Sequence, residues 1–484
     1  MTTERNAAAA KMSEQSLAQK VAQRAFECNA NSLPPETFAK AELHLLDTLG
    51  LALASYSQDF AKPSLAGIFA AAGQGDCFVI GSERRLAARD AAFANGLLMH
   101  GLDFDDTHLA SIIHASVASL PAALAMAEHL DASWDDMLCA YILGMEVSIR
   151  LGASVQGGFH HVGFHATGIV SHFSSAVVAG KLLGLDPDQL CAAQGVAAST
   201  TSGVQAFLEE GAWTKRMHPG WGALAGVTAA YMVQAGFVAP TRPYEARFGL
   251  YDTHLHETKP LPALLVDTFG QEWRMLETAI KPYPICHFSH GCTEAAIALS
   301  AQLAGRIDEI AEVTAFLPEP TLHIVAEPPE AKQNVTTDYE AKFSAQFCVA
   351  MGLIKGRFGL KELTAEALAN TEVQTLTRKV VCEADSASQF PKYFSGRLTV
   401  KLKDGTIFNQ DVPINKGAGD RSMSAEDITE KFLANAQLKL TPEQAAKTLD
   451  ILRHARTRSV RAVLQDIGAV ESPKSIPRRS TRRR

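Results

Sequence analysis

The amino-acid sequence predicts a mainly α-helical protein, in which a large all-helical domain is interrupted by a smaller α+β domain. Up to about residue 240 the chain is rich in alanine, and its apolar residues recur at helical spacing. Short β-like runs appear after about residue 275, and helical spacing returns after residue 421. We therefore expect the helical domain at residues 1–275 and 421–470, the α+β domain at residues 276–420 and a basic, disordered tail at residues 471–484.

Start and stop signals mark several helices of the first part. Ser133 followed by Asp136 has the spacing of a capping box, and Gly184 is a typical helix stop. The many small residues predict helices that pack closely together. Helices are expected over Phe38–Ser57, Ala87–Met99, from Ser133 towards Arg150, over Thr167–Leu183 and over Gly222–Ala235.

The middle segment has the pattern of a small sheet with helices. Arg397–Phe408 is the clearest hairpin, because apolar and polar residues alternate and Asp404-Gly405 supplies the turn. Further strands are expected at Val313–Leu317 and Lys379–Cys382, with a helix at Glu340–Leu353 between them. Beyond this segment, Ser424 and Thr441 are expected to start the helices of the return segment.

Composition excludes several classes of protein. The net charge of −7 does not fit a nucleic-acid binder, and no uninterrupted apolar run is long enough for a membrane span. The N-terminus lacks an apolar signal core. Eight scattered cysteines without a CxxC pair fit neither a disulfide framework nor a zinc knuckle, so we expect a cytoplasmic protein. Dinucleotide, Walker A, HExxH and GxSxG motifs are absent from the sequence.

The densest cluster of polar residues runs from His100 to His108, HGLDFDDTH, with His114 six residues further on. Three interpretations stay open: a helix-capping turn, acid–base machinery in which carboxylates orient imidazoles, and a metal site. The sequence after Asp105 lacks the third acid of a DDxxD motif, which weakens the metal interpretation.

Three further clusters combine polar residues with glycine or proline. The stretch from His160 to Gly168 lies at a loop-to-helix junction, which favours an anion. Lys215 and Arg216 precede a Pro-Gly turn and a helix start, where they could clamp a carboxylate or form a solvated basic turn. In the stretch from Lys281 to His290, prolines fix a rigid loop that carries Cys286, a reactive thiol or inert packing.

Taken together, these stretches resemble the MmgE/PrpD family over roughly residues 15 to 465. The matching segments are Leu45-Leu-Asp-Thr-Leu-Gly50, His100-Gly-Leu-Asp-Phe-Asp-Asp-Thr-His108, Gly163-Phe-His-Ala-Thr-Gly168, Lys215-Arg-Met-His-Pro-Gly-Trp221, Lys281-Pro-Tyr-Pro284 with His290, Tyr339-Glu-Ala-Lys-Phe-Ser344 and Lys403-Asp-Gly405.

The resemblance implies a large helical domain with a smaller α+β lid domain, usually in a homodimer. It also implies 2-methylcitrate dehydratase, cis-aconitate decarboxylase or iminodisuccinate epimerase activity, on a small polycarboxylate substrate. No cofactor, metal, nucleic acid or membrane partner is expected.

The resemblance also places the active site. It implies catalytic roles for Asp103, His114, His165 and Lys215. Substrate-binding roles are expected for Thr107, Arg216, Lys281, Tyr283 and Cys286. Some decarboxylases of the family carry a histidine where this chain has Cys286.

These residue types suit one chemical problem, which is to form a carbanion next to a carboxylate. Lys215, with Arg216 or Lys281, would stabilise the developing charge. His165 or His114 would move the proton, and Asp103 would orient an imidazole or act as the base. Which histidine is the acid and which is the base stays open.

The leading hypothesis is a 2-methylcitrate dehydratase-type lyase, with a decarboxylase or an epimerase of the same family as alternatives. Two hypotheses come from other classes. One is a metal-dependent helical hydrolase that uses Asp103, Asp105 and His108, and the other is a non-catalytic carboxylate-binding protein.

Overall fold

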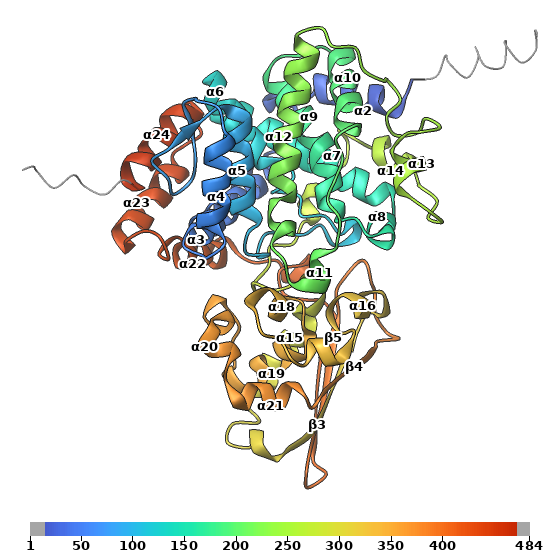
Figure 1. Cartoon of the computed structure of the whole chain (residues 1–484), viewed down its shortest axis with the longest axis vertical. Helices are drawn as coiled ribbons and strands as arrows, with labels where there is room; N and C mark the ends of the chain where they lie inside the picture. The colour runs from blue at the N-terminus through green and yellow to red at the C-terminus, as the bar shows by residue number, and fades with distance from the viewer. Residues whose placement is uncertain (1–14, 472–484) are drawn as a thin grey trace, which may run out of the picture.

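The computed structural model describes residues 15–471, and the predicted basic tail beyond residue 471 lies outside them. The described chain is mostly helical and carries a small sheet, as the sequence predicts. Figure 1 shows a helical body with a mixed α+β part below it. Two hydrophobic cores correspond to these parts, one built mainly from residues 17–280 and 428–467 and the other mainly from residues 279–418.

The first part of the chain forms most of the helical body. Its helices are α2 (Leu17–Glu27), α3 (Pro35–Tyr56), α4 (Ala61–Ala71), α5 (Ala88–His100), α6 (Leu120–Leu130), α7 (Trp134–Ser154), α8 (Gly158–Val162), α9 (Ala166–Leu182), α10 (Pro187–Ala198), α11 (Phe207–Glu210), α12 (Thr214–Gln234), α13 (Leu250–His254) and α14 (Ala263–Val266).

This part is not all-helical, which corrects the prediction. A two-stranded antiparallel ribbon joins β1 (Cys77–Phe78) to β2 (Arg85–Leu86). Strands of two residues are too short to show the alternation on which a strand prediction rests.

The predicted helix signals act as expected at several ends. The Ser133 side chain accepts a hydrogen bond from the Asp136 backbone N–H at the start of α7. After α9, Gly184 adopts a positive φ of 70°. By length and composition α7 could cross a membrane, but its apolar stretch is entirely buried within the protein, as expected of a core helix.

Helix α12 begins earlier than predicted. The sequence suggested a Pro-Gly turn ahead of a helix over Gly222–Ala235, whereas the helix starts at Thr214 and contains Pro219. Pro219 costs only one intrahelical hydrogen bond close to the N-terminus of the helix. Glycine is required at Gly220, because a Cβ there would lie 2.4 Å from the Phe93 carbonyl oxygen of α5. The early start places Lys215 on a rigid helix.

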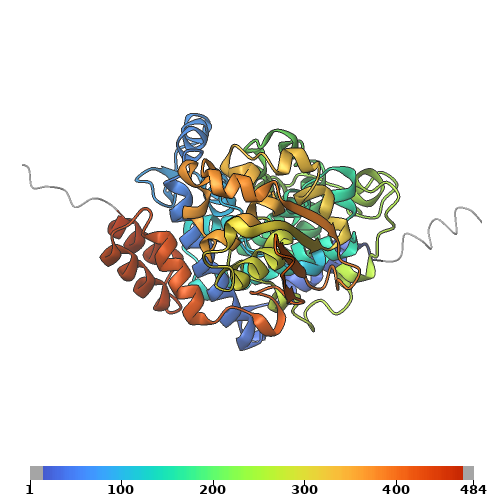
Figure 2. The same ribbon diagram turned by 90° about the horizontal axis from the view of Figure 1, so that it is seen from below.

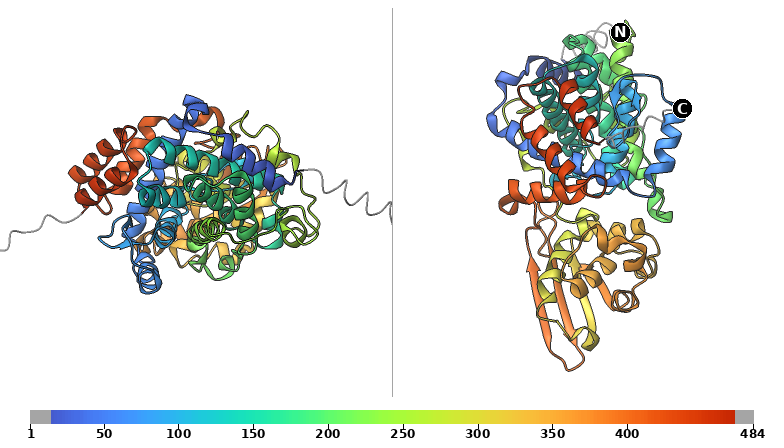
Figure 3. Two further views of the ribbon diagram at one scale, coloured as in Figure 1. Left: turned by 90° about the horizontal axis from the view of Figure 1, so that it is seen from above. Right: turned by 90° about the vertical axis from the view of Figure 1, so that its left-hand side faces the viewer.

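The mixed part contains one four-stranded sheet in the order β4-β3-β5-β6. Strand β3 pairs with β4 in parallel and with β5 antiparallel, and Val400 lies opposite Phe408 in the predicted β5–β6 hairpin. Helices cover one face of the sheet, as the side view in Figure 3 shows. The strands are β3 (Ile310–Leu317), β4 (Val380–Ala384), β5 (Gly396–Leu402) and β6 (Ile407–Val412).

Short helices make up the rest of the mixed part. The predicted helix at Glu340–Leu353 is two helices, since the first ends at Lys342 and the Ser344 hydroxyl caps the start of the second. The helices are α15 (His290–Ser300), α16 (Leu322–Val325), α17 (Pro329–Lys332), α18 (Asp338–Lys342), α19 (Ala345–Lys355), α20 (Ala365–Leu368) and α21 (Thr371–Thr377).

The return segment packs on the helical body. It consists of α22 (Ala425–Ala436), α23 (Pro442–Arg453) and α24 (Val460–Glu471), of which the first two are capped by the predicted Ser424 and Thr441. Seen from below, these red helices lie at one side of the body, away from the sheet (Figure 2). Phe432 of α22 is fully buried against the helical core.

Candidate active site

A cavity of about 50 Å³ lies where the helical body meets the mixed part. Side chains of both parts line it, and most of the predicted site residues are among them. The lining consists of Asp103, Thr107, Ile112, His114, His160, His165, Gln205, Phe207, Leu208, Lys215, Lys281, Cys286, His287, Phe288, Ile324, Phe343 and Phe394.

Asp103 is held in place by the turn that follows α5. Its backbone has a positive φ of 52°, which is uncommon for a residue other than glycine. The next residues tie this turn to the mixed part, because Thr107 and Ala279 exchange backbone hydrogen bonds of 2.8 and 2.9 Å. Ala279 lies two residues before Lys281, so this bridge brings the Lys281 side chain close to Asp103.

Two lysines share the Asp103 carboxylate. The Nζ atoms of Lys215 and Lys281 lie 3.0 and 2.9 Å from the same oxygen, Oδ1. Lys281 also donates to the Asp103 carbonyl oxygen at 2.8 Å. Burial opposes ionisation of Asp103, but the two ammonium groups lower its pKa well below the usual value. Among the residues that line the cavity, two cations therefore face one anion, and the Asp105 carboxylate lies close to them outside the lining.

The imidazoles beside this triad are neutral bases. Burial, reinforced by Lys281 and Lys215, lowers the pKa of His114 to about 3, and Asp105 only partly opposes this. Burial and Lys215 likewise hold the pKa of His165 well below its usual value. His114 donates its Nδ1 proton to the Asp106 carbonyl oxygen at 2.8 Å, so its Nε2 carries the lone pair. That Nε2 lies 3.8 Å from Asp103 Oδ1.

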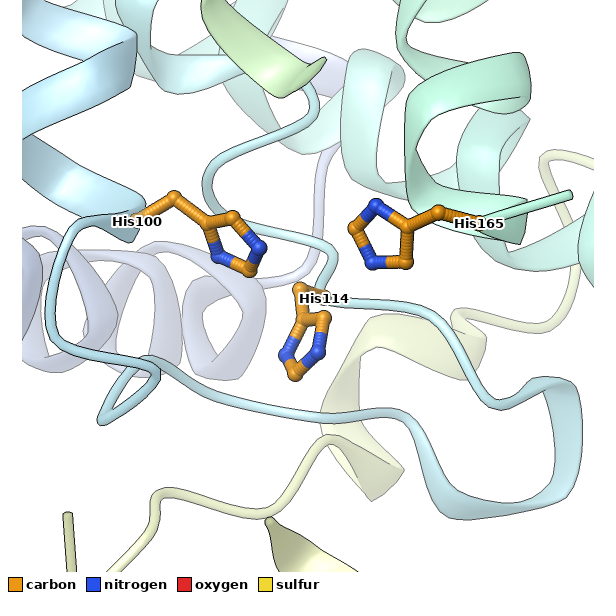
Figure 4. A group of neighbouring side chains, drawn as sticks. All are labelled: His100, His114 and His165. Carbon is orange, nitrogen blue, oxygen red and sulfur yellow. The ribbon is translucent and has the colours of Figure 1, made fainter. Parts of the chain in front are cut away.

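His100 and Asp105 belong to the same group, although the sequence analysis assigned His100 no specific role and named Asp105 only as a metal ligand of the alternative hydrolase. His100 Nδ1 lies 2.9 Å from Asp105 Oδ2, and its ring stacks on that of His165. Figure 4 shows the rings of His100, His114 and His165 facing one another. The HGLDFDDTH stretch contained both residues, but only the fold shows which acids turn towards the histidines.

The structure places two predicted substrate-binding residues outside the cavity lining. The Arg216 guanidinium lies between the rings of Phe60 and Tyr339 and pairs with Asp338 at 3.3 Å. The partly buried Tyr283 ring packs against the buried His290. Cys286 does line the cavity, and burial raises the pKa of its thiol.

The three metal ligands of the hydrolase hypothesis, Asp103, Asp105 and His108, do not come together. His108 accepts from the Ser111 backbone N–H, and its Nε2 lies 3.6 Å from the exposed Glu277. Within residues 15–471, the groups with metal-like spacing are His100, His114 and His165, and Asp103, Asp105 and His114.

Several lining residues were not predicted. His287 and Phe343 lie within stretches that the sequence analysis singled out without giving these two residues a role, whereas Phe207 comes from a segment with no distinctive sequence signal. They enclose the charged group, since Lys215 Nζ lies 5.0 Å from the centre of the Phe343 ring.

The fold and the site together define a class of protein, an enzyme-like helical scaffold with a polar cavity against an α+β part. The MmgE/PrpD N-terminal domain matches residues 17–262, and the MmgE/PrpD C-terminal domain matches residues 283–456. The chain belongs to the MmgE/PrpD family.

Its curated relatives carry names from two activities. The cis-aconitate decarboxylase-like protein oryM of Aspergillus oryzae is 26% identical over 84% of this chain and 87% of its own length. Human cis-aconitate decarboxylase is 27% identical over 81% and 82% of the two chains. The 2-methylcitrate dehydratase of Cupriavidus necator is 25% identical over 83% and 86%. The relatives are thus enzymes at low identity, and their names differ in the reaction.

Proposed function

We propose that the protein is a lyase that removes a proton next to a carboxylate of a small di- or tricarboxylate, with 2-methylcitrate-type dehydration as the leading reaction. The observation that carries this proposal is the arrangement of Lys215 and Lys281 around one carboxylate, beside two neutral imidazoles. The excess of positive charge suits an anionic substrate.

The lysines have a second effect on the chemistry. Burial, together with the two lysines, depresses the pKa of His114 and His165, so these imidazoles are weak bases in the free protein. A bound polycarboxylate offsets the lysine charges and thereby raises the pKa of the imidazoles. Substrate binding itself turns them into effective bases.

The elimination then follows from the positions of the groups. One neutral imidazole takes the proton from the carbon, and the lysines stabilise the negative charge that develops on the adjacent carboxylate. The hydroxyl leaves with a proton from an acid in the cavity, a role that the second histidine fills once it is protonated.

The mixed part acts in this proposal as a lid. Lys281, His287 and Phe343 of the mixed part line the cavity together with Asp103 and His165 of the helical body, so the substrate lies between the two parts. The homodimer and the cytoplasmic location stay predictions of the sequence.

Decarboxylation of cis-aconitate is the second candidate, and the names of several relatives favour it. The same lysines would stabilise the carbanion left by loss of CO₂. An epimerase would need only the proton-transfer half of the dehydration.

Incubation of the full chain with 2-methylcitrate, citrate and cis-aconitate tests the proposal. Dehydration produces alkene absorbance, and decarboxylation produces itaconate. Incubation in deuterated buffer detects an epimerase, which exchanges a substrate proton without net product. Turnover of 2-methylcitrate is expected. If no di- or tricarboxylate reacts and none exchanges, the proposal is wrong.

A further inference from the structure

Three imidazoles from distant parts of the chain converge beside the cavity. His100 is the last residue of α5, His114 precedes α6 and His165 caps α9. One ring nitrogen from each can be chosen so that all three lie within 4.8 Å of one another. The ring centres are 4.9, 5.5 and 6.1 Å apart, and Figure 4 shows the three rings gathered at one place.

The Nδ1 atom of each ring is already occupied. His100 Nδ1 contacts the Asp105 carboxylate, and His114 Nδ1 donates to the Asp106 carbonyl oxygen. His165 Nδ1 lies 3.2 Å from His218 Nδ1, so one of these two donates to the other. Each ring is therefore held through Nδ1, which leaves Nε2 for a further partner.

These Nε2 atoms lack partners of their own. His100 and His165 are 1% and 3% exposed, and neither Nε2 has a hydrogen-bond partner among the described residues. The His114 side chain is 12% exposed and faces the cavity. Several other buried ring nitrogens also lack partners, among them His172 Nε2, but only at this place in the described part of the chain do two of them lie beside a third imidazole with metal-like spacing.

We propose that the Nε2 atoms of His100, His114 and His165 form a binding site for one divalent transition-metal ion of the Zn²⁺ type. Metal-binding histidines characteristically donate their second N–H to a carboxylate or carbonyl oxygen, as His100 and His114 do here. Tetrahedral Zn–N bonds of about 2.0–2.1 Å place ligand nitrogens about 3.4 Å apart, so the rings need to move by only about 1 Å. A fourth ligand comes from the cavity side.

Nearby charges set the strength of this site. Asp105 supplies a carboxylate behind His100, and its Oδ2 also lies 3.4 Å from His114 Nδ1. Lys215 and Lys281 oppose a cation, although both are paired with Asp103. The ion consequently binds reversibly. On the proposed function, which needs free His114 and His165 nitrogens, a bound ion blocks proton transfer and inhibits the enzyme.

Direct binding tests the site without any assay of turnover. The full chain is dialysed against Zn²⁺ or Co²⁺ in a buffer free of polycarboxylates, which would chelate the metal. One Zn²⁺ per chain and the intense visible absorbance of four-coordinate Co²⁺ are expected. No stoichiometric binding, or a weak octahedral Co²⁺ spectrum, overturns the proposal whether or not the protein is a lyase.

Variants locate the ion. His100→Gln removes one ligand and abolishes the Co²⁺ band, while Asp105→Asn weakens binding about 10- to 100-fold by loosening His100. Lys215→Met removes a repelling cation and tightens binding. The matched control is His172→Gln, because His172 is also buried with an unpartnered Nε2 but does not line the cavity.

Folding of each variant is checked by its thermal melting. A Co²⁺ band that persists in folded His100→Gln contradicts the site. If that variant does not fold, Asp105→Asn and Lys215→Met decide, since opposite shifts in affinity are expected only for an ion at this position.

Discussion

Two groups of buried charges lie within the helical body, and they differ in how they are paired. At the cavity, two lysines converge on a single carboxylate oxygen of Asp103. Deeper in the body, Arg150 pairs with Glu146 at 2.8 Å, and its remaining N–H groups donate to backbone carbonyl oxygens such as those of Asp267 and Glu272. The interior pair is balanced, whereas the cavity has surplus positive charge.

The way in which buried charges are paired distinguishes structural from functional charges. Burial alone does not distinguish them, because Arg150 and Lys281 are both almost inaccessible to solvent. A balanced and fully bonded pair can only hold the fold together, while surplus charge next to a cavity is free to act on a ligand. Substitutions in the two groups should therefore change different quantities.

The largest expected effect belongs to the interior pair. Arg150→Met leaves the buried Glu146 without its cation and should lower the free energy of unfolding by about 3–5 kcal/mol. Chemical denaturation measures this loss. Arg24→Met is the control, because its exposed pair with Glu27 should contribute less than about 1 kcal/mol. Equal losses of unfolding free energy in Arg150→Met and Arg24→Met would show that the buried pair stabilises the fold no more than the exposed pair does.

The cavity variant Lys281→Met should instead lose activity. Removal of one stabilising donor typically costs about 100- to 1,000-fold in rate, and Asp103 keeps Lys215 as its counter-ion. Steady-state kinetics with the reactive polycarboxylate measures kcat/KM, and a melting curve checks the fold. A stability loss as large as that of Arg150→Met, with activity kept, would place Lys281 among the structural charges.

The pH dependence of stability gives a further test of buried charge, at Glu128. Burial raises its pKa from 4.5 to about 7, despite the Phe78 N–H and Arg85 that favour its charged form. The folded protein thus binds this proton more tightly than the unfolded chain does. The resulting stability is fully present below pH 4.5 and is lost as pH rises through 7, by about 3 kcal/mol in total.

Denaturation at a series of pH values measures this slope. In Glu128→Gln the decline between pH 4.5 and 7 should be smaller than in the unaltered protein. An identical slope in both proteins would show that Glu128 is not responsible.

The smallest effect is expected at Tyr283, which the sequence assigned to substrate binding. Its hydroxyl group lies outside the cavity lining, so Tyr283→Phe should change the free energies of unfolding and of substrate binding by no more than about 0.5 kcal/mol. A tenfold rise in KM of Tyr283→Phe would instead show that Tyr283 contributes to substrate binding.

Local patterns of the sequence predicted much of the fold. The hairpin of β5 and β6 follows from alternation and an Asp-Gly turn, and the ends of α7 and α9 follow from Ser133 and Gly184. The start of α12 was missed because Pro219 is a breaker signal, while the contacts that keep the helix intact there come from α5 and α9.

The site could be predicted only in part for the same reason. The resemblance to the family brought together Asp103, His165 and Lys215, which all line the cavity. It could not separate Lys215 from Arg216, since adjacent residues of a helix point in different directions and only the neighbours decide which one reaches the cavity. Only the fold shows that Asp105 turns towards His100, after a turn in which residue 103 has a positive φ.

The long sequence separation between Asp103 and Lys281 has a consequence for synthesis on the ribosome. Asp103 and Lys281 lie 178 residues apart in the sequence. Lys342 donates to the Leu102 carbonyl oxygen, and these two residues are 240 positions apart. A nascent chain released before residue 281 contains the acidic turn but lacks one of its two counter-ions and the segment that fastens it. The ribosome must translate past residue 342 before these contacts can form. A product terminated earlier can form the helices of the first part but not the complete site.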